Sequence, residues 1–109
     1  MALVQESLDD DKAEDVVVID LSGKSSIADF MVIASGTSSR HVSAMTDHIV
    51  ESLKKNGVKG VSCEGQARGD WVLVDSGDVI VHLFRPEVRT FYNIEKIWAV
   101  DSAHRMVRD

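Results

Sequence analysis

The segment from Gly69 to Glu87 constrains the fold most, because it contains two strand-like runs joined by a short polar turn. The turn, Asp75-Ser76-Gly77-Asp78, places a glycine where a positive φ is often required, which is typical of a β-hairpin. Side chains alternate between the two faces of a strand, so the first run has one purely apolar side and one mixed side. The mixed side consists of Trp71, Leu73 and Asp75.

The second run, Val79 to Phe84, is apolar on both faces apart from His82. Such a run is typical of a strand that lies inside a sheet and is covered on both sides. Trp71 follows a carboxylate, Asp70, at the start of a strand with a polar side. This arrangement is compatible either with a surface made for a partner or with an ordinary core tryptophan. For His82 we expect a half-buried strand residue whose polar atoms are satisfied.

Hydrophobic periodicity predicts the remaining elements of the chain. We expect helices over residues 3–12, from Thr37 or Ser38 as N-cap to about Lys55, and over 91–98 after a helical turn at Pro86. Further strands are expected over residues 15–20, 30–34 and 58–63, the first of them as a central strand, with a polar turn over residues 21–26. This pattern predicts a single domain of the α/β (α+β) class, with a mixed sheet of about five strands flanked by helices. We expect the domain to span residues 1–98 and a C-terminal tail to span 99–109, with Trp98 packed in the core.

Composition limits the classes of function. A chain of 109 residues that is 44% hydrophobic has room for one core, and no apolar run approaches the length of a membrane span. The N-terminus lacks the features of a signal peptide, so a cytoplasmic protein is expected. The net charge is −6 and the basic residues are scattered, which disfavours direct nucleic-acid binding. The acidity favours a basic protein partner, or it serves solubility alone.

The turn from Ser35 to Ser39 is a candidate phosphate site, because it follows a strand and precedes a helix whose N-terminus offers free N–H groups. It matches neither the phosphate-loop nor the dinucleotide-binding pattern, so a plain helix cap is the favoured interpretation. A metal-dependent nucleotidyltransferase would also need a closely spaced acidic pair on the next strand. Here the acid at that distance is Asp47, which is expected inside a helix.

Other reactive side chains also lack part of a catalytic set. His41 and His48 stand two helical turns apart, too far for joint metal ligation, and there is no C-x-x-C. Asp75 and Asp78 flank the hairpin turn, where turn chemistry explains both. Cys63 has no neighbouring base and is expected to be a small buried residue. The sequence therefore predicts a protein without catalytic residues, metal or cofactor.

Two long blocks of the sequence resemble the ribosomal silencing factor family, also called Iojap-like proteins. They are DVVVIDLSGKSSIADFMVIASGTSSRHVSAM and GDWVLVDSGDVIVHLFRPEVRTFYNIEKIW, and the resemblance covers roughly residues 8–98. It implies a nucleotidyltransferase-like fold without nucleotidyltransferase activity. It also implies binding to the large ribosomal subunit through its protein fourteen, which blocks joining of the small subunit and silences translation when nutrients are scarce. Members of this family are often homodimers in isolation.

Aromatic and arginine side chains surrounded by carboxylates are typical of protein interfaces, and they cluster around the hairpin and the segment after it. Tyr92 is expected to be more exposed than its neighbour Phe91. Two alternative functions remain: a metal-dependent nucleotidyltransferase or nucleotide-binding enzyme that uses Ser35 to Ser39, and a general dimeric interaction module. The candidate partner-binding residues are Asp70, Trp71, Leu73, Asp75, Arg85, Glu87 and Tyr92.

Overall fold

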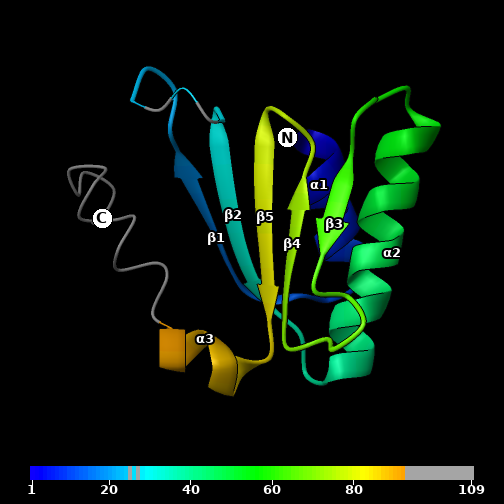
Figure 1. The fold of residues 1–109 in the computed structure, drawn as a ribbon, viewed down its shortest axis with the longest axis vertical. Coiled ribbons are helices and arrows are strands. Elements are labelled where there is room, and N and C mark those ends of the chain that lie inside the picture. Colours follow the sequence, from blue (N-terminus) through cyan, green and yellow to red (C-terminus); the bar gives the residue numbers. More distant parts are fainter. Residues whose placement is uncertain (25, 27, 93–109) are drawn as a thin grey trace.

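The computed structural model describes residues 1–24, 26 and 28–92, which form one sheet with helices packed against it (Figure 1). The helices are α1 (Ala2–Asp10), α2 (Ser39–Lys55) and α3 (Pro86–Tyr92). The strands are β1 (Glu14–Asp20), β2 (Phe30–Ser35), β3 (Ser62–Glu64), β4 (Trp71–Asp75) and β5 (Val79–Phe84). The predicted single domain with a mixed five-stranded sheet is confirmed.

The strands lie in the order β1-β2-β5-β4-β3. The pair β2·β5 is parallel and the other pairs are antiparallel. A parallel pair requires a crossover connection, and the chain makes it with α2, β3 and β4. The central strand β5 is the run predicted to be apolar on both faces, and the hairpin turn contains Gly77 at φ +93°.

Helices α1 and α2 cover one face of the sheet and enclose an aliphatic core. Helix α2 begins after Ser38, whose hydroxyl accepts a hydrogen bond from the backbone N–H of His41, and Gly57 follows the helix at φ +84°. Both ends of α2 therefore match the prediction. The core side chains on this face come from α1, α2 and the strands β2, β4 and β5: Val4, Leu8, Val42, Met45, Ile49, Leu53, Val32, Ala34, Val72, Val74, Val79, Val81 and Leu83.

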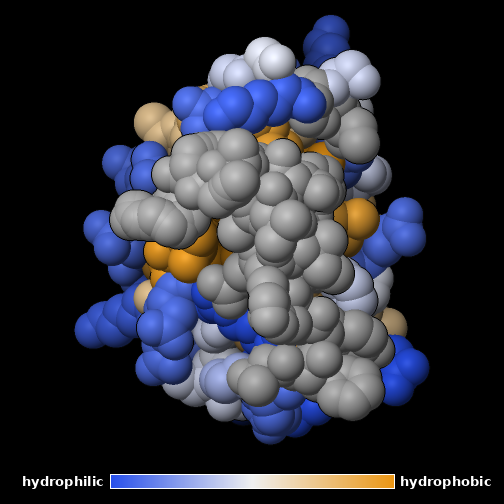
Figure 2. Space-filling model, turned by 90° about the vertical axis from the view of Figure 1, so that its left-hand side faces the viewer, coloured by the Kyte–Doolittle hydropathy of each residue, from blue (hydrophilic) through white to orange (hydrophobic). Residues whose placement is uncertain are grey.

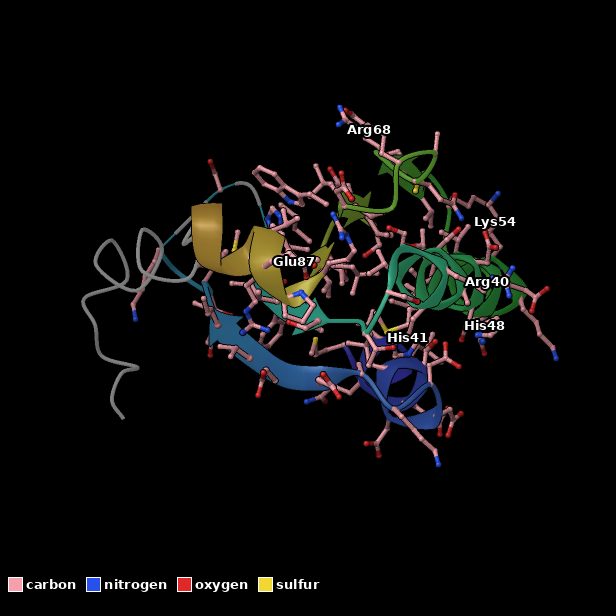
Figure 3. All side chains as sticks on the ribbon, turned by 90° about the horizontal axis from the view of Figure 1, so that it is seen from below. Arg40, His41, His48, Lys54, Arg68 and Glu87 are labelled. Carbon is pink, nitrogen blue, oxygen red and sulfur yellow. The ribbon has the colours of Figure 1, made fainter. Side chains whose placement is uncertain are left out.

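A second cluster lies on the opposite face, which α3 approaches (Figure 3). Its buried members are Ile19, Leu21, Met31, Ile33 and Phe84, with Val17, Trp71 and Val88 packed against them. The buried side chain of Arg89 connects α3 to the strands β1 and β2. Its guanidinium donates hydrogen bonds to the carbonyl of Asp15 at 2.7 Å and to Oγ of Ser35 at 2.9 Å.

The prediction that residues 15–20 form a central strand was wrong. Strand β1 is the edge of the sheet and pairs with β2 alone, with an irregular register between Glu14 and Val17. Val16 and Val18 are 41% and 36% exposed, because the helical layer does not extend over them. Figure 2 views the molecule from this side and shows apolar surface between polar side chains. A β-branched run predicts a strand without indicating how many neighbours the strand will have.

Other boundaries also differ from the prediction. Strand β3 is limited to Ser62–Glu64, and Cys63 is only partly buried because β3 is a short edge strand. Leu21, placed in a polar turn, is almost fully buried in the second cluster. The helical turn predicted at Pro86, with the proline at the first helical position, is confirmed as the start of α3, but the helix runs from it without a break to Tyr92.

The part of the predicted 91–98 helix beyond residue 92, Trp98 and the 99–109 tail lie outside the described residues. Within the described part of the chain, no helix is long and apolar enough to cross a membrane.

Candidate functional site

Three rings gather on one face of the β4–β5 hairpin. Trp71 is paired with Phe84 across the two strands, and their rings stack with centroids 5.1 Å apart and planes 27° apart. His82 lies diagonally across from Trp71, with its ring centroid 6.0 Å from the indole and 6.1 Å from Phe84. Trp71 is half-buried, whereas Phe84 and His82 are buried. The rings of Phe84 and His82 thus form the buried layer of this face, and the indole of Trp71 packs on them and is partly exposed to solvent.

The indole of Trp71 is held by a hydrogen bond. Its Nε1–H donates to Nδ1 of His82 at 3.0 Å. Because the indole nitrogen is only a donor, Nδ1 must accept, and the proton of the neutral imidazole is on Nε2. Burial lowers the pKa of His82 from its ordinary value of 6.5 to about 4, so the ring is neutral near pH 7. The predicted satisfied histidine is confirmed, although it is more buried than expected.

Charged residues form a short network at the end of the hairpin. Arg85 donates from Nε and Nη2 to the same carboxylate oxygen of Asp70, at 3.0 and 2.7 Å, and from Nη1 to Glu87 at 3.2 Å. Arg68, which is exposed, lies 3.9 Å from the other oxygen of Asp70. The predicted residues Asp70, Arg85 and Glu87 are therefore brought together at one site.

A hollow of about 270 Å³ opens beside the aromatic cluster. Its wall includes Gly65, which has a φ of +87°. A Cβ atom added there would collide with the carbonyl oxygen of Trp71, so the position has no room for a side chain. The loop before β4 is thus closely fitted to the start of that strand. The hollow is lined by Glu64, Gly65, Trp71, Leu73 and His82.

The other predicted residues are distributed as follows. Leu73 and Asp75 lie on the same face as Trp71 and are half-buried, which confirms the predicted alternation along β4. The carboxylate of Asp75 accepts a hydrogen bond from the backbone N–H of Gly77 at 2.8 Å and so helps to form the turn. Tyr92 is the last residue of α3, and its side chain lies outside what the structure describes.

Two backbone amides of the turn from Ser35 to Ser39 donate hydrogen bonds to other parts of the protein. The N–H of Gly36 donates to the carbonyl of Phe84 at 2.9 Å, and the N–H of Thr37 donates to Nδ1 of His41 at 2.9 Å. An added Cβ on Gly36 would lie 2.9 Å from side-chain atoms of Val42 and Met45. These contacts connect β2 and β5 to the start of α2, so the turn serves as a structural cap.

His41 and His48 both contact Asp11 in the segment after α1. Nε2 of His41 lies 2.8 Å from the carbonyl oxygen of Asp11, and Nδ1 of His48 lies 2.6 Å from its carboxylate. The hydrogen bond and the charge of Asp11 raise the pKa of the exposed His48. Burial raises the pKa of the Cys63 thiol, which leaves it protonated and weakly nucleophilic. Within the described residues, no three histidine, cysteine, aspartate or glutamate side chains are grouped to hold a metal ion.

The sequence argument missed the connection between His82 and Trp71. The hairpin register was the available signal, because a turn with Gly77 and Asp78 at its centre pairs Leu73 with His82 and Trp71 with Phe84. Diagonal neighbours on one face are within reach of long and aromatic side chains.

Comparison with known proteins places the whole chain in one family. Residues 1–109 match the family model described as "Ribosomal silencing factor during starvation". The chain is 54% identical over 98 residues to a ribosomal silencing factor of Zymomonas mobilis, covering 90% of this chain and 74% of that one. Over 102 residues it is 47% identical to a homologue of that name from Haemophilus influenzae, covering 91% and 100%.

A solved structure supports the same assignment. The crystal structure of a Chromobacterium violaceum protein aligns with a TM-score of 0.86 at 42% identity, covering 90% of this chain and 82% of that one. Sequence and fold therefore agree with the resemblance stated from the two sequence blocks. The chain belongs to the ribosomal silencing factor family.

Proposed function

We propose that this protein is a non-enzymatic, cytoplasmic translation repressor that binds the large ribosomal subunit through its protein fourteen. The bound protein occupies the surface that the small subunit must reach, so the two subunits cannot join while it is present. Repression by this route needs no cofactor and no reaction, and it would act when nutrients are scarce. The observation that carries the proposal is the family match over residues 1–109.

The proposed contact face is the mixed face of the β4–β5 hairpin with its adjoining charges. It combines a half-buried tryptophan over an aromatic floor with arginine and carboxylate groups, a composition enriched at protein interfaces. The acidic character of the chain, with net charge −6, suits a basic protein partner better than bare RNA. The residues proposed to contact the partner are Asp70, Trp71, Leu73, Asp75, Arg85, Glu87 and Tyr92.

The free protein is proposed to be a homodimer, as the family resemblance implies. Sedimentation equilibrium of the pure protein would measure its mass directly. A mass of two chains that falls to one as protein concentration decreases is expected. A single chain at every concentration would contradict this part of the proposal.

A subunit-joining assay tests the function itself. Isolated large subunits are incubated with the protein, small subunits are added, and joined ribosomes are separated on a sucrose gradient. The wild-type protein is expected to reduce joining, and Trp71→Ala is expected to restore it. The matched control is Lys54→Ala, an exposed change on α2 away from the hairpin (Figure 3), which should inhibit as well as the wild type. Undiminished joining with excess wild-type protein would refute the proposal.

A further inference from the structure

We propose that His82 is a positioning residue that holds the indole of Trp71 in its binding orientation. This inference rests on the proposed function, in which Trp71 is a contact residue. It extends that function by assigning a role to a buried side chain that is not itself proposed to contact the partner. The observation behind it is the 3.0 Å hydrogen bond from Nε1 of Trp71 to Nδ1 of His82.

The stacking contact between the indole and Phe84 does not by itself determine which way Nε1 of Trp71 points. Stacking on Phe84 determines the plane in which the indole lies, with the two rings 27° apart. Stacking alone does not distinguish the two orientations related by a half-turn about the Cβ–Cγ bond, because an aromatic face offers no directional partner. A hydrogen bond is directional, so the bond to His82 selects the orientation in which Nε1 points toward β5.

His82 is suited to this role because its own position is well determined. It lies on the central strand β5, is only 8% exposed, and is opposite Leu73 on β4 and Ile33 on β2. Its buried ring is neutral near pH 7, so Nδ1 remains an acceptor. Within the described residues, the side chain of His82 has Trp71 and Phe84 as its hydrogen-bond and ring partners, and neither is charged.

An ordered side chain strengthens binding by reducing the entropy lost when the complex forms. Immobilising one flexible side chain at an interface typically costs an amount equivalent to about fivefold in affinity. Loss of the His82 acceptor is therefore expected to weaken binding to large subunits by about fivefold, without removing any atom of the contact surface.

A double-mutant cycle tests this role. Trp71→Phe keeps an aromatic ring over Phe84 and removes the N–H, while His82→Leu keeps an apolar strand side chain and removes the acceptor. Each single change should weaken binding to large subunits by about fivefold. The double variant should bind large subunits with about the same affinity as either single variant. Losses that multiply to about twenty-fivefold would show that His82 acts independently of Trp71 and would overturn the proposal.

A second readout needs no ribosome. Hydrogen exchange of the Trp71 indole N–H, followed by NMR, should be slow in the wild type and much faster in His82→Leu. His82→Asn, which retains an acceptor near the same place, should restore slow exchange and much of the affinity. Equal exchange rates in wild type and His82→Leu would overturn the positioning role. Failure of the wild type to bind large subunits would instead refute the proposed function, so the two failures are distinguishable.

Discussion

The two faces of the β4–β5 hairpin are made from the same strands but differ in chemistry. The face under α1 and α2 consists of Val72, Val74, Val79, Val81 and Leu83, all buried and all aliphatic. The opposite face carries a tryptophan, a histidine and a carboxylate, and Trp71, Leu73 and Asp75 on it are only half-buried. Aliphatic side chains pack without needing polar partners, whereas aromatic and charged ones have directional requirements that a binding partner can meet. The first face is wholly buried core, whereas the second combines buried Phe84 and His82 with the half-buried side chains that we propose contact the partner.

A pair of leucines provides the sharpest test of this difference. Leu83→Ala, on the helix-covered face, should lower the free energy of unfolding by about 3 kcal/mol because it opens a cavity in the core. Leu73→Ala removes the same atoms from the half-buried face and should cost about 1 kcal/mol or less of stability, while weakening subunit binding. Denaturant unfolding of both variants measures the contrast. Equal losses of stability would show that both faces are core.

Truncation of the aromatic anchors should affect binding more than folding. Trp71→Ala and Tyr92→Ala are each expected to weaken binding to large subunits by about thirtyfold, equivalent to about 2 kcal/mol. A core tryptophan would instead cost about 3–5 kcal/mol of folding stability. Thermal melting and binding assays on the same variants separate the two cases. A variant that melts much earlier, and whose folded fraction binds normally, would reassign that residue to the core.

His82 is expected to make the free energy of unfolding depend on pH. Its folded pKa is lowered to about 4, whereas the unfolded chain takes up the proton near 6.5. The unfolded state therefore binds more protons between these values, and stability falls as the pH falls through this window. From pH 7 to 5 the wild type should lose about 2 kcal/mol more than His82→Asn, which cannot titrate there.

Unfolding in denaturant at these two pH values measures that difference. His48, whose pKa is raised by Asp11, contributes in the opposite sense, since its stabilisation is present at low pH and lost as pH rises through its folded pKa. His48 is present in both the wild type and His82→Asn, so its contribution to stability cancels when the two proteins are compared. Parallel losses in wild type and variant would contradict a neutral, buried His82.

The smallest expected effect comes from the exposed charges. Glu87, with a side chain 66% exposed, should contribute little to stability, and Glu87→Gln should weaken binding about twofold at low salt. At about 1 M salt the variant and wild type should bind alike, because exposed charges are screened there. Glu51→Gln, an exposed change on α2, is the matched control and should have no effect at either salt concentration. A salt-independent loss in Glu87→Gln would indicate a desolvated contact instead.

Local sequence patterns predicted much of this fold and most of the proposed contact face. Strand alternation and the turn at Gly77 placed Trp71, Leu73 and Asp75 on one face, and the N-cap candidate Ser38 marked the start of α2. These features depend on neighbours within a few residues, which a sequence displays directly.

Features that depend on distant packing were not predictable in the same way. The edge position of β1 depends on which strand lies beside it, and the run of valines carries no such information. The contacts of His41 and His48 with Asp11 join residues 30 and 37 positions apart. The bond between Trp71 and His82 requires both the hairpin register and two specific rotamers. Side-chain partnerships of this kind require the folded structure.

Co-sedimentation with isolated ribosomal subunits tests the central claim most directly. Wild-type protein, Trp71→Ala and Lys54→Ala are each mixed with large subunits, small subunits or naked ribosomal RNA, and the bound fraction is measured after centrifugation. We expect the wild type and Lys54→Ala to sediment with large subunits alone, and Trp71→Ala to remain largely unbound. Equal binding to both subunits, binding reproduced by naked RNA, or undiminished binding of Trp71→Ala would contradict recognition of the large subunit by the mixed face of the hairpin.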